Sequence, residues 1–214
     1  IQRWVRRILG WRGKAMTRSL WEQKFGPQLK KKMEQRGTPV LHYRNERGKI
    51  VAWFQGGAEF GPRALGNRSI LAKPFPASMK DHINERVKFR EYFRPFAGAI
   101  LDEFRPAYCE ISQSSPHMLI ACKVRKGKRE EIPAVVHIDG SCRIQTVSEQ
   151  DNPRFRKVIE AFYALTGTPV VLNTSFNIKG QPIVNTPEQA IQTYQSTQLD
   201  CLVLGDYFFE KILT

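Results

Sequence analysis

Apolar residues recur at helical spacing in the second half of the chain. In Pro153–Thr166 the repeat of three to four residues predicts a helix with one buried face, formed by Phe155, Val158, Ile159 and Phe162. Either Asp151 or Asn152 can cap the start of this helix, Pro153 suits its first turn, and Gly167 ends it.

Two further helices are predicted from local signals. Met79–Phe89 places Ile83 and Val87 on one face. A capped helix begins at Thr186 and runs to about residue 197, because Gln189 three residues later completes a capping box.

Short apolar runs between turn residues predict strands, and the segment 56–67 between two of these regions is predicted to be a loop. Helices that alternate with strands predict one α/β domain over residues 38–214 with a mixed, strand-rich sheet. The predicted strands are Val40–Tyr43, Lys49–Phe54, Phe96–Leu101, Met118–Val124, Ala134–Ile138, Arg143–Val147, Pro169–Leu172 and Leu202–Leu204.

Charge is distributed unevenly along the 214 residues. The formal net charge is +14, from 34 Lys and Arg against 20 Asp and Glu. Residues 1–49 carry +11 of it, from fourteen basic and three acidic residues, and the remainder carries +3. Residues 1–37 are therefore predicted to be a basic linker or docking segment, partly disordered, with a nucleic-acid-binding arm as the alternative interpretation.

Cysteine and histidine spacing argues against a metal site built by this chain. The four cysteines form no C-x-x-C pair and lie in apolar context, which favours buried, reduced thiols in a cytoplasmic protein. The four histidines show no H-x-x-x-H spacing. No apolar run approaches the roughly 18 residues that a membrane span requires, so no membrane contact is expected.

Two motifs combine basic residues with glycine or aromatic residues. In Glu59–Ser69 a glycine-rich turn carries Arg63, which can bind an oxyanion through two parallel hydrogen bonds, although glycine-rich loops are also common without a ligand. In Lys88–Phe96 three cations are interleaved with four aromatic residues. This pattern suits an anion pocket or single-stranded nucleic acid, and equally a helix end with basic stems packed over rings.

Two further motifs place polar residues on strands. In His137–Val147 a hairpin turn precedes Arg143 and Gln145, which alternation puts on one face of the sheet. That face either lines a site or is simply solvated. A buried strand leads into Asn173–Asn177, and strand ends in α/β sheets are places where ligands bind, although Asn and Ser are also common in turns.

Taken in order, these four motifs resemble the C-terminal domain of the O-carbamoyltransferases, over roughly residues 38–210. The string from Glu59 to Ser69 is the most specific part of the resemblance. The family implies a YrdC-like α/β fold with a twisted, largely antiparallel sheet. It also implies that carbamoyl phosphate and ATP, with magnesium, are converted to carbamoyl-adenylate. A separate, actin-like N-terminal domain would then transfer the carbamoyl group to a hydroxyl acceptor.

The resemblance implies roles for seven residues. Four basic side chains would bind the reacting phosphates, and a polar string would bind nucleotide and magnesium. The basic set is Arg63, Lys88, Arg94 and Arg143, and the polar set is Asn173, Ser175 and Asn177.

Two positions depart from the family pattern. Gly57 stands where the family has arginine, and Gly98 stands where it has proline. The missing cation at Gly57 keeps open a catalytically degenerate remnant as an alternative. A basic nucleic-acid-binding module is the other alternative, since the N-terminal segment is strongly positive.

Overall fold

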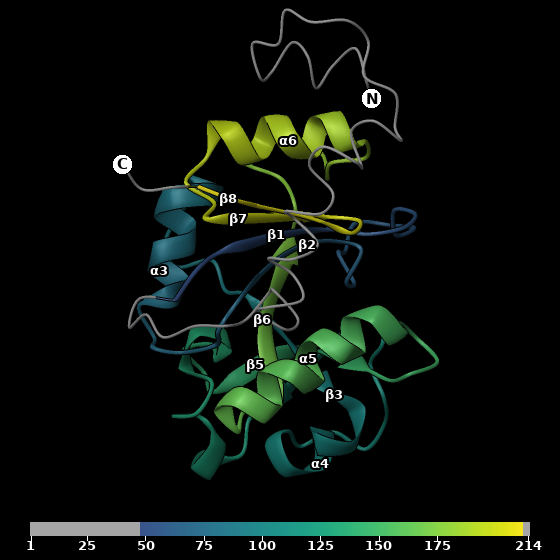
Figure 1. Ribbon diagram of the computed structural model, residues 1–214. Coiled ribbons are helices and arrows are strands. Elements are labelled where there is room, and N and C mark those ends of the chain that lie inside the picture. Colours follow the sequence, from purple (N-terminus) through teal and green to yellow (C-terminus); the bar gives the residue numbers. More distant parts are fainter. Residues whose placement is uncertain (1–47, 212–214) are drawn as a thin grey trace, which may run out of the picture.

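The computed structural model describes residues 48–211 (Figure 1). The predictions for residues 1–37 and for the strand Val40–Tyr43 lie outside this range. The described elements are β1 (Val51–Phe54), β2 (Arg68–Ala72), α3 (Met79–Ile83), β3 (Ala97–Leu101), α4 (Arg105–Tyr108), β4 (Ile120–Lys123), β5 (Ser141–Val147), α5 (Pro153–Thr166), β6 (Val170–Ser175), α6 (Pro187–Ser196), β7 (Cys201–Leu204) and β8 (Tyr207–Glu210).

All eight strands form one sheet in the order β4-β5-β3-β6-β2-β1-β7-β8. Neighbouring strands are antiparallel except for the pairs β3–β5 and β1–β7, which are parallel. In Figure 1, β7 and β8 run horizontally whereas β6 runs vertically, so the sheet is strongly twisted. The predicted mixed, largely antiparallel α/β architecture is confirmed.

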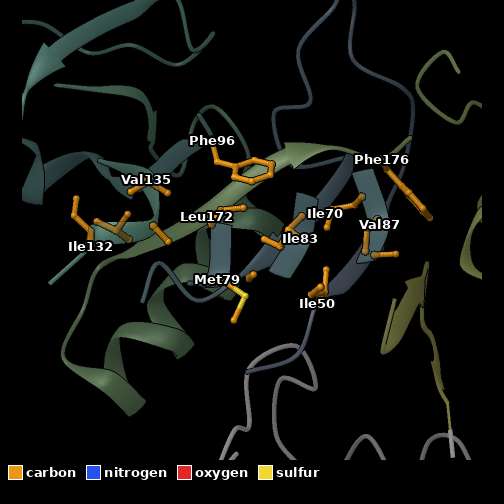
Figure 2. Close-up of a cluster of buried hydrophobic side chains, with 14 of the residues drawn as sticks. Ile50, Ile70, Met79, Ile83, Val87, Phe96, Ile132, Val135, Leu172 and Phe176 are labelled. Carbon is orange, nitrogen blue, oxygen red and sulfur yellow. The ribbon is translucent and has the colours of Figure 1, made fainter. Parts of the chain in front are cut away.

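Helices cover both faces of the sheet, because neighbouring residues of each strand point to opposite sides. On β6, Val170 and Leu172 enter one core and Val171 the other. The first core, shown in Figure 2, packs α3 and α6 against the sheet and includes Met79 and Ile83. The second core packs the apolar face of α5, with Phe155 fully buried.

Both capped helices have the predicted ends. Asn152 caps α5, since its side-chain oxygen accepts a hydrogen bond from the Phe155 amide at 3.0 Å, and Gly167 ends the helix in the left-handed region at φ 74°. Thr186 and Gln189 form the predicted capping box at the start of α6.

The predicted helix Met79–Phe89 is confirmed in two parts. An α-helical turn, α3, continues as a π-helical turn over Asn84–Lys88, and Phe89 ends it at φ 48°. Widening to π geometry at this point changes the direction in which Lys88 leaves the helix.

One predicted strand is wrong, and two strands of the sheet were not predicted. The predicted strand Ala134–Ile138 is absent, and Pro133–Val135 forms a 3-10 turn, because Pro133 cannot donate a ladder hydrogen bond. The strands β2 and β8 have no counterpart among the predictions, and β7 is therefore not the last strand.

The cysteines of the described region agree with the expectation of buried, reduced thiols. All four cysteines are buried and none forms a disulfide. Within residues 48–211, every helix is too short or too polar to traverse a lipid bilayer.

Candidate functional site

The sheet topology brings the four sequence motifs together at one end of the central strands. Because β3 and β5 run opposite to β6, the start of β3 and β5 and the end of β6 meet on the same side. β2 is also antiparallel to β6, so the loop that leads into β2 ends there as well. The predicted residues therefore come from segments that are distant in sequence and close in the fold.

Lys88 joins the second motif to the fourth. Its side chain is 3% exposed, and Nζ donates to Ser175 O at 2.5 Å, to Asn177 O at 3.1 Å and to Asn177 Oδ1 at 2.8 Å. Ser175 Oγ lies 3.3 Å from the same nitrogen and donates to Asn177 Oδ1 at 2.7 Å. Three of the seven predicted residues thus form one buried polar cluster.

Burial makes the charged form of the Lys88 side chain less stable. Removal from water and, to a smaller extent, the charge of the neighbouring Arg90 guanidinium together lower its pKa from 10.5 to about 7. No carboxylate bonds the ammonium among the contacts described above, since all its acceptors are neutral oxygens. A ligand anion placed nearby would stabilise the charged form.

The loop between β1 and β2 is held in shape by Glu59. One carboxylate oxygen accepts hydrogen bonds from the amides of Leu65 and Asn67, both at 2.7 Å, and from the Arg68 amide at 3.2 Å. The Trp53 indole donates to Gly66 O at 2.7 Å. The loop is therefore ordered before any ligand binds, and it carries the exposed Arg63 at its turn.

Gly66 shows how closely this loop approaches α5. Its φ is +112°, and a Cβ there would lie 2.4 Å from the ring of Phe155. Only glycine satisfies both the backbone conformation and the contact.

Asn173 is buried beneath this loop instead of being available on the surface. It is 1% exposed, and its amide nitrogen donates to Ala64 O at 3.1 Å and to Gln145 Oε1 at 2.8 Å. Its Oδ1 is buried and has no hydrogen-bond partner within the described residues. Asn173 therefore contacts the loop that carries Arg63, while Ser175 and Asn177 contact Lys88.

Arg143 lies within electrostatic range of two arginines from other motifs, Arg63 and Arg90. Burial lowers the pKa of the half-buried Arg143, and the nearby Arg63 lowers it further. Burial also lowers the pKa of Arg90, followed by the charges of Arg94 and Arg143. Mutual repulsion among these cations is relieved by an anion, so the cluster favours a negatively charged ligand.

The arginines differ in their protein partners. Arg94 is exposed and pairs with Glu91 at 3.1 Å, and Arg90 donates to Asn84 Oδ1 at 2.8 Å. Within residues 48–211, neither Arg63 nor Arg143 forms an ion pair with a carboxylate, and Arg143 Nε is buried without an acceptor. Unsatisfied buried donors of this kind call for a partner.

Residues 44–211 match a protein-family model, described as the carbamoyltransferase C-terminus. This chain belongs to that family. The predicted resemblance is thereby confirmed, and this carbamoyltransferase C-terminal domain has curated relatives over most of its length.

Three relatives illustrate the similarity. Nodulation protein NolNO of Sinorhizobium fredii is 48% identical over 167 residues, which cover 77% of this chain and 25% of that protein. Nodulation protein NolO of Bradyrhizobium diazoefficiens is 46% identical over 167 residues, covering 77% and 30%. A 3'-hydroxymethylcephem-O-carbamoyltransferase of Amycolatopsis lactamdurans is 38% identical over 164 residues, covering 77% and 31%. The chain thus spans between a quarter and a third of the length of these relatives.

Sequence reasoning missed two arginines of this carbamoyltransferase C-terminal domain. Arg90 belongs to the cationic cluster, and its position between the predicted Lys88 and Arg94 was the available signal. Arg68 is 3% exposed; it donates to Gln55 O at 2.7 Å and to Gly56 O at 3.0 Å and stacks 3.5 Å from the Phe54 ring centroid. Its contacts hold the backbone at the end of β1, which gives it a structural role.

The described residues do not fit a magnesium site of their own. The oxygens predicted to receive magnesium, Ser175 Oγ and Asn177 Oδ1, already lie against the Lys88 ammonium. Between residues 48 and 211, no group of three or more His, Cys, Asp or Glu side chains is arranged to hold a metal ion. Mg²⁺ is usually held by carboxylates, waters and substrate phosphates.

Proposed function

We propose that this domain activates a carbamoyl group in a carbamoyltransferase. In this proposal it converts carbamoyl phosphate and ATP to carbamoyl-adenylate, phosphate and pyrophosphate. A separate N-terminal domain would then move the carbamoyl group to a hydroxyl acceptor. The observation that carries the proposal is the convergence of Arg63, Arg90 and Arg143 at one sheet edge, where Arg63 and Arg143 lack carboxylate partners among residues 48–211.

The chemistry requires a site that neutralises phosphate charge twice. In the first step water adds to the carbamoyl carbon, and the bond to the phosphate oxygen breaks to give carbamate and phosphate. In the second step a carbamate oxygen attacks the α-phosphorus of ATP, and the bond to the bridging oxygen breaks to release pyrophosphate. Both steps build negative charge on phosphate oxygens, which preorganised guanidinium groups stabilise.

The arginines suit this task because the fold holds them before substrate arrives. Arg63 lies on a loop fixed by the Glu59 carboxylate, and Arg143 lies on β5. Groups that need no reorganisation give the largest electrostatic stabilisation, and removing one such donor costs about 10²-fold in rate.

The Lys88 cluster supports the second substrate. Its ammonium holds the backbone and side chain of the segment that follows β6, so Ser175 and Asn177 have fixed positions. A nucleotide bound beside this segment would meet ordered polar groups and a cation whose charge it stabilises. This agrees with the prediction that Ser175 and Asn177 contribute to nucleotide binding.

ATP–pyrophosphate exchange tests the proposal. The full chain, alone and combined with the N-terminal domain of a relative, should exchange labelled pyrophosphate into ATP only when carbamoyl phosphate is present. Arg143→Gln should lower the exchange rate by about 10²-fold. Lys157→Gln, on the exposed side of α5, is the matched charge control and should leave the rate unchanged. Absence of exchange in both preparations, or exchange that ignores carbamoyl phosphate, would contradict the proposed reaction.

A further inference from the structure

A buried amide bridge connects the sheet to the loop that carries Arg63. Gln145 is 2% exposed; its Nε2 donates to Leu65 O at 2.9 Å, and its Oε1 accepts from Asn173 Nδ2 at 2.8 Å. Asn173 in turn donates to Ala64 O at 3.1 Å. Two adjacent carbonyls of the loop are therefore bonded by two side chains that also bond each other.

Small residues on the intervening strand make this bridge possible. Gln145 pairs with Ala99 on β3, and Asn173 pairs with Ala97 on the same strand. Residues two apart on a strand face the same side, so both alanine side chains lie beneath the two amides. Their short side chains leave room for the amides of β5 and β6 to meet above β3.

We infer that Gln145 is a positioning residue that fixes Arg63 beside Arg143. Ala64 and Leu65 directly follow Arg63, so holding their carbonyls sets where the arginine leaves the loop. Arg143 is two residues before Gln145 on the same strand and on the same face. The Gln145 side chain therefore links the loop that carries Arg63 to the strand that carries Arg143. This inference rests on the proposed function, in which the two arginines bind substrate phosphate.

Gln145→Met tests the inference, since methionine is unbranched, fills a similar volume and cannot donate the hydrogen bond to Leu65 O. Hydrogen exchange of the full chain should show faster exchange of the Leu65 and Asn67 amides, which the ordered loop bonds to Glu59. Gln192→Met, on the exposed side of α6, is the matched control and should leave these amides unchanged.

A double-mutant cycle on ATP binding separates positioning from a general structural effect. Loss of the bridge should weaken binding about tenfold, the scale of one hydrogen bond. In the Arg63→Gln background the same change should weaken it by less than about twofold, because the group being positioned is already gone. Gln145→Glu keeps the acceptor for Asn173 and loses the donor for Leu65 O, so the Leu65 and Asn67 amides should also exchange faster in this variant.

The outcomes distinguish this inference from the proposed function. Unchanged loop exchange in both Gln145 variants, or an equal loss of ATP affinity with and without Arg63, would overturn the positioning role even if wild-type binding is tight. Faster loop exchange in the Gln145 variants, together with a wild-type chain that binds neither ATP nor carbamoyl phosphate, would support the bridge and refute the proposed function alone.

Discussion

Lys88→Met removes a buried cation and should change how the stability of the domain depends on pH. The Lys88 pKa is 10.5 in the unfolded chain and about 7 in the fold, because burial disfavours the ammonium. Between these values the unfolded chain binds more protons than the fold, so the stability contribution of Lys88 rises with pH. It is complete above the unfolded pKa and is lost as pH falls through about 7.

The size of the effect follows from linkage. One pKa unit corresponds to about 1.4 kcal/mol, so the wild type should gain about 3 kcal/mol relative to Lys88→Met between about pH 6 and about pH 9.5. The hydrogen bonds to Ser175 and Asn177 are lost at every pH. They therefore add a constant offset and leave the slope unchanged.

Urea unfolding at several pH values measures this difference, because other titrating groups cancel between the two proteins. Lys157→Met, which removes an exposed lysine of α5, is the control and should show no such slope. A constant difference between the wild type and Lys88→Met across the whole range would refute the reasoning. It would mean that the oxygens around Lys88 stabilise the ammonium enough to keep its pKa in the fold at the unfolded value.

Three further outcomes are expected. Arg143→Gln should weaken ATP binding by about tenfold or more in calorimetry, since a charge-assisted donor is lost, whereas unchanged affinity would remove this arginine from the site. Gly66→Ala should lower the free energy of unfolding by about 3 kcal/mol in denaturant titrations, because φ +112° is strained for alanine and the alanine Cβ would clash with the Phe155 ring. A loss below about 1 kcal/mol would contradict this tight contact. Gly57→Arg should strengthen ATP binding, as no heavy atom lies within 4 Å of a Cβ at that position, and calorimetry showing weaker binding would argue against a phosphate site there.

Sequence pattern predicted the elements whose signals are local. The start and end of α5 follow from Asn152 and Gly167, whose side chain and backbone act within one turn. The strand β2 was missed because Arg68 and Ser69 are polar, and their burial depends on partners far along the chain. The predicted strand Ala134–Ile138 failed for a different reason, since Ala134 and Val135 are buried in a 3-10 turn without strand pairing and Ile138 is exposed.

The candidate site was predictable as a set of motifs and not as a geometry. The order of the motifs indicated that Lys88 and the Asn173–Asn177 segment act together, and the structure places Lys88 against Ser175 and Asn177. The burial of Asn173 depends on its register opposite Ala97, which no single segment encodes. For the same reason Gln145 could be assigned to a face of the sheet but not to the loop above it.

Because β6 lies near the middle of the sheet, ligand binding at this site is coupled to folding of the whole sheet. Three hydrogen bonds of the site join residues at least 80 positions apart: Lys88 to Ser175, Gln145 to Leu65, and Asn173 to Ala64. A polyphosphate that recognises their arrangement can therefore bind only when nearly the whole sheet has assembled. At a hundred times its dissociation constant such a ligand would add about 2.7 kcal/mol to the global stability. Resistance to proteolysis would then report occupancy of the site without any catalytic turnover.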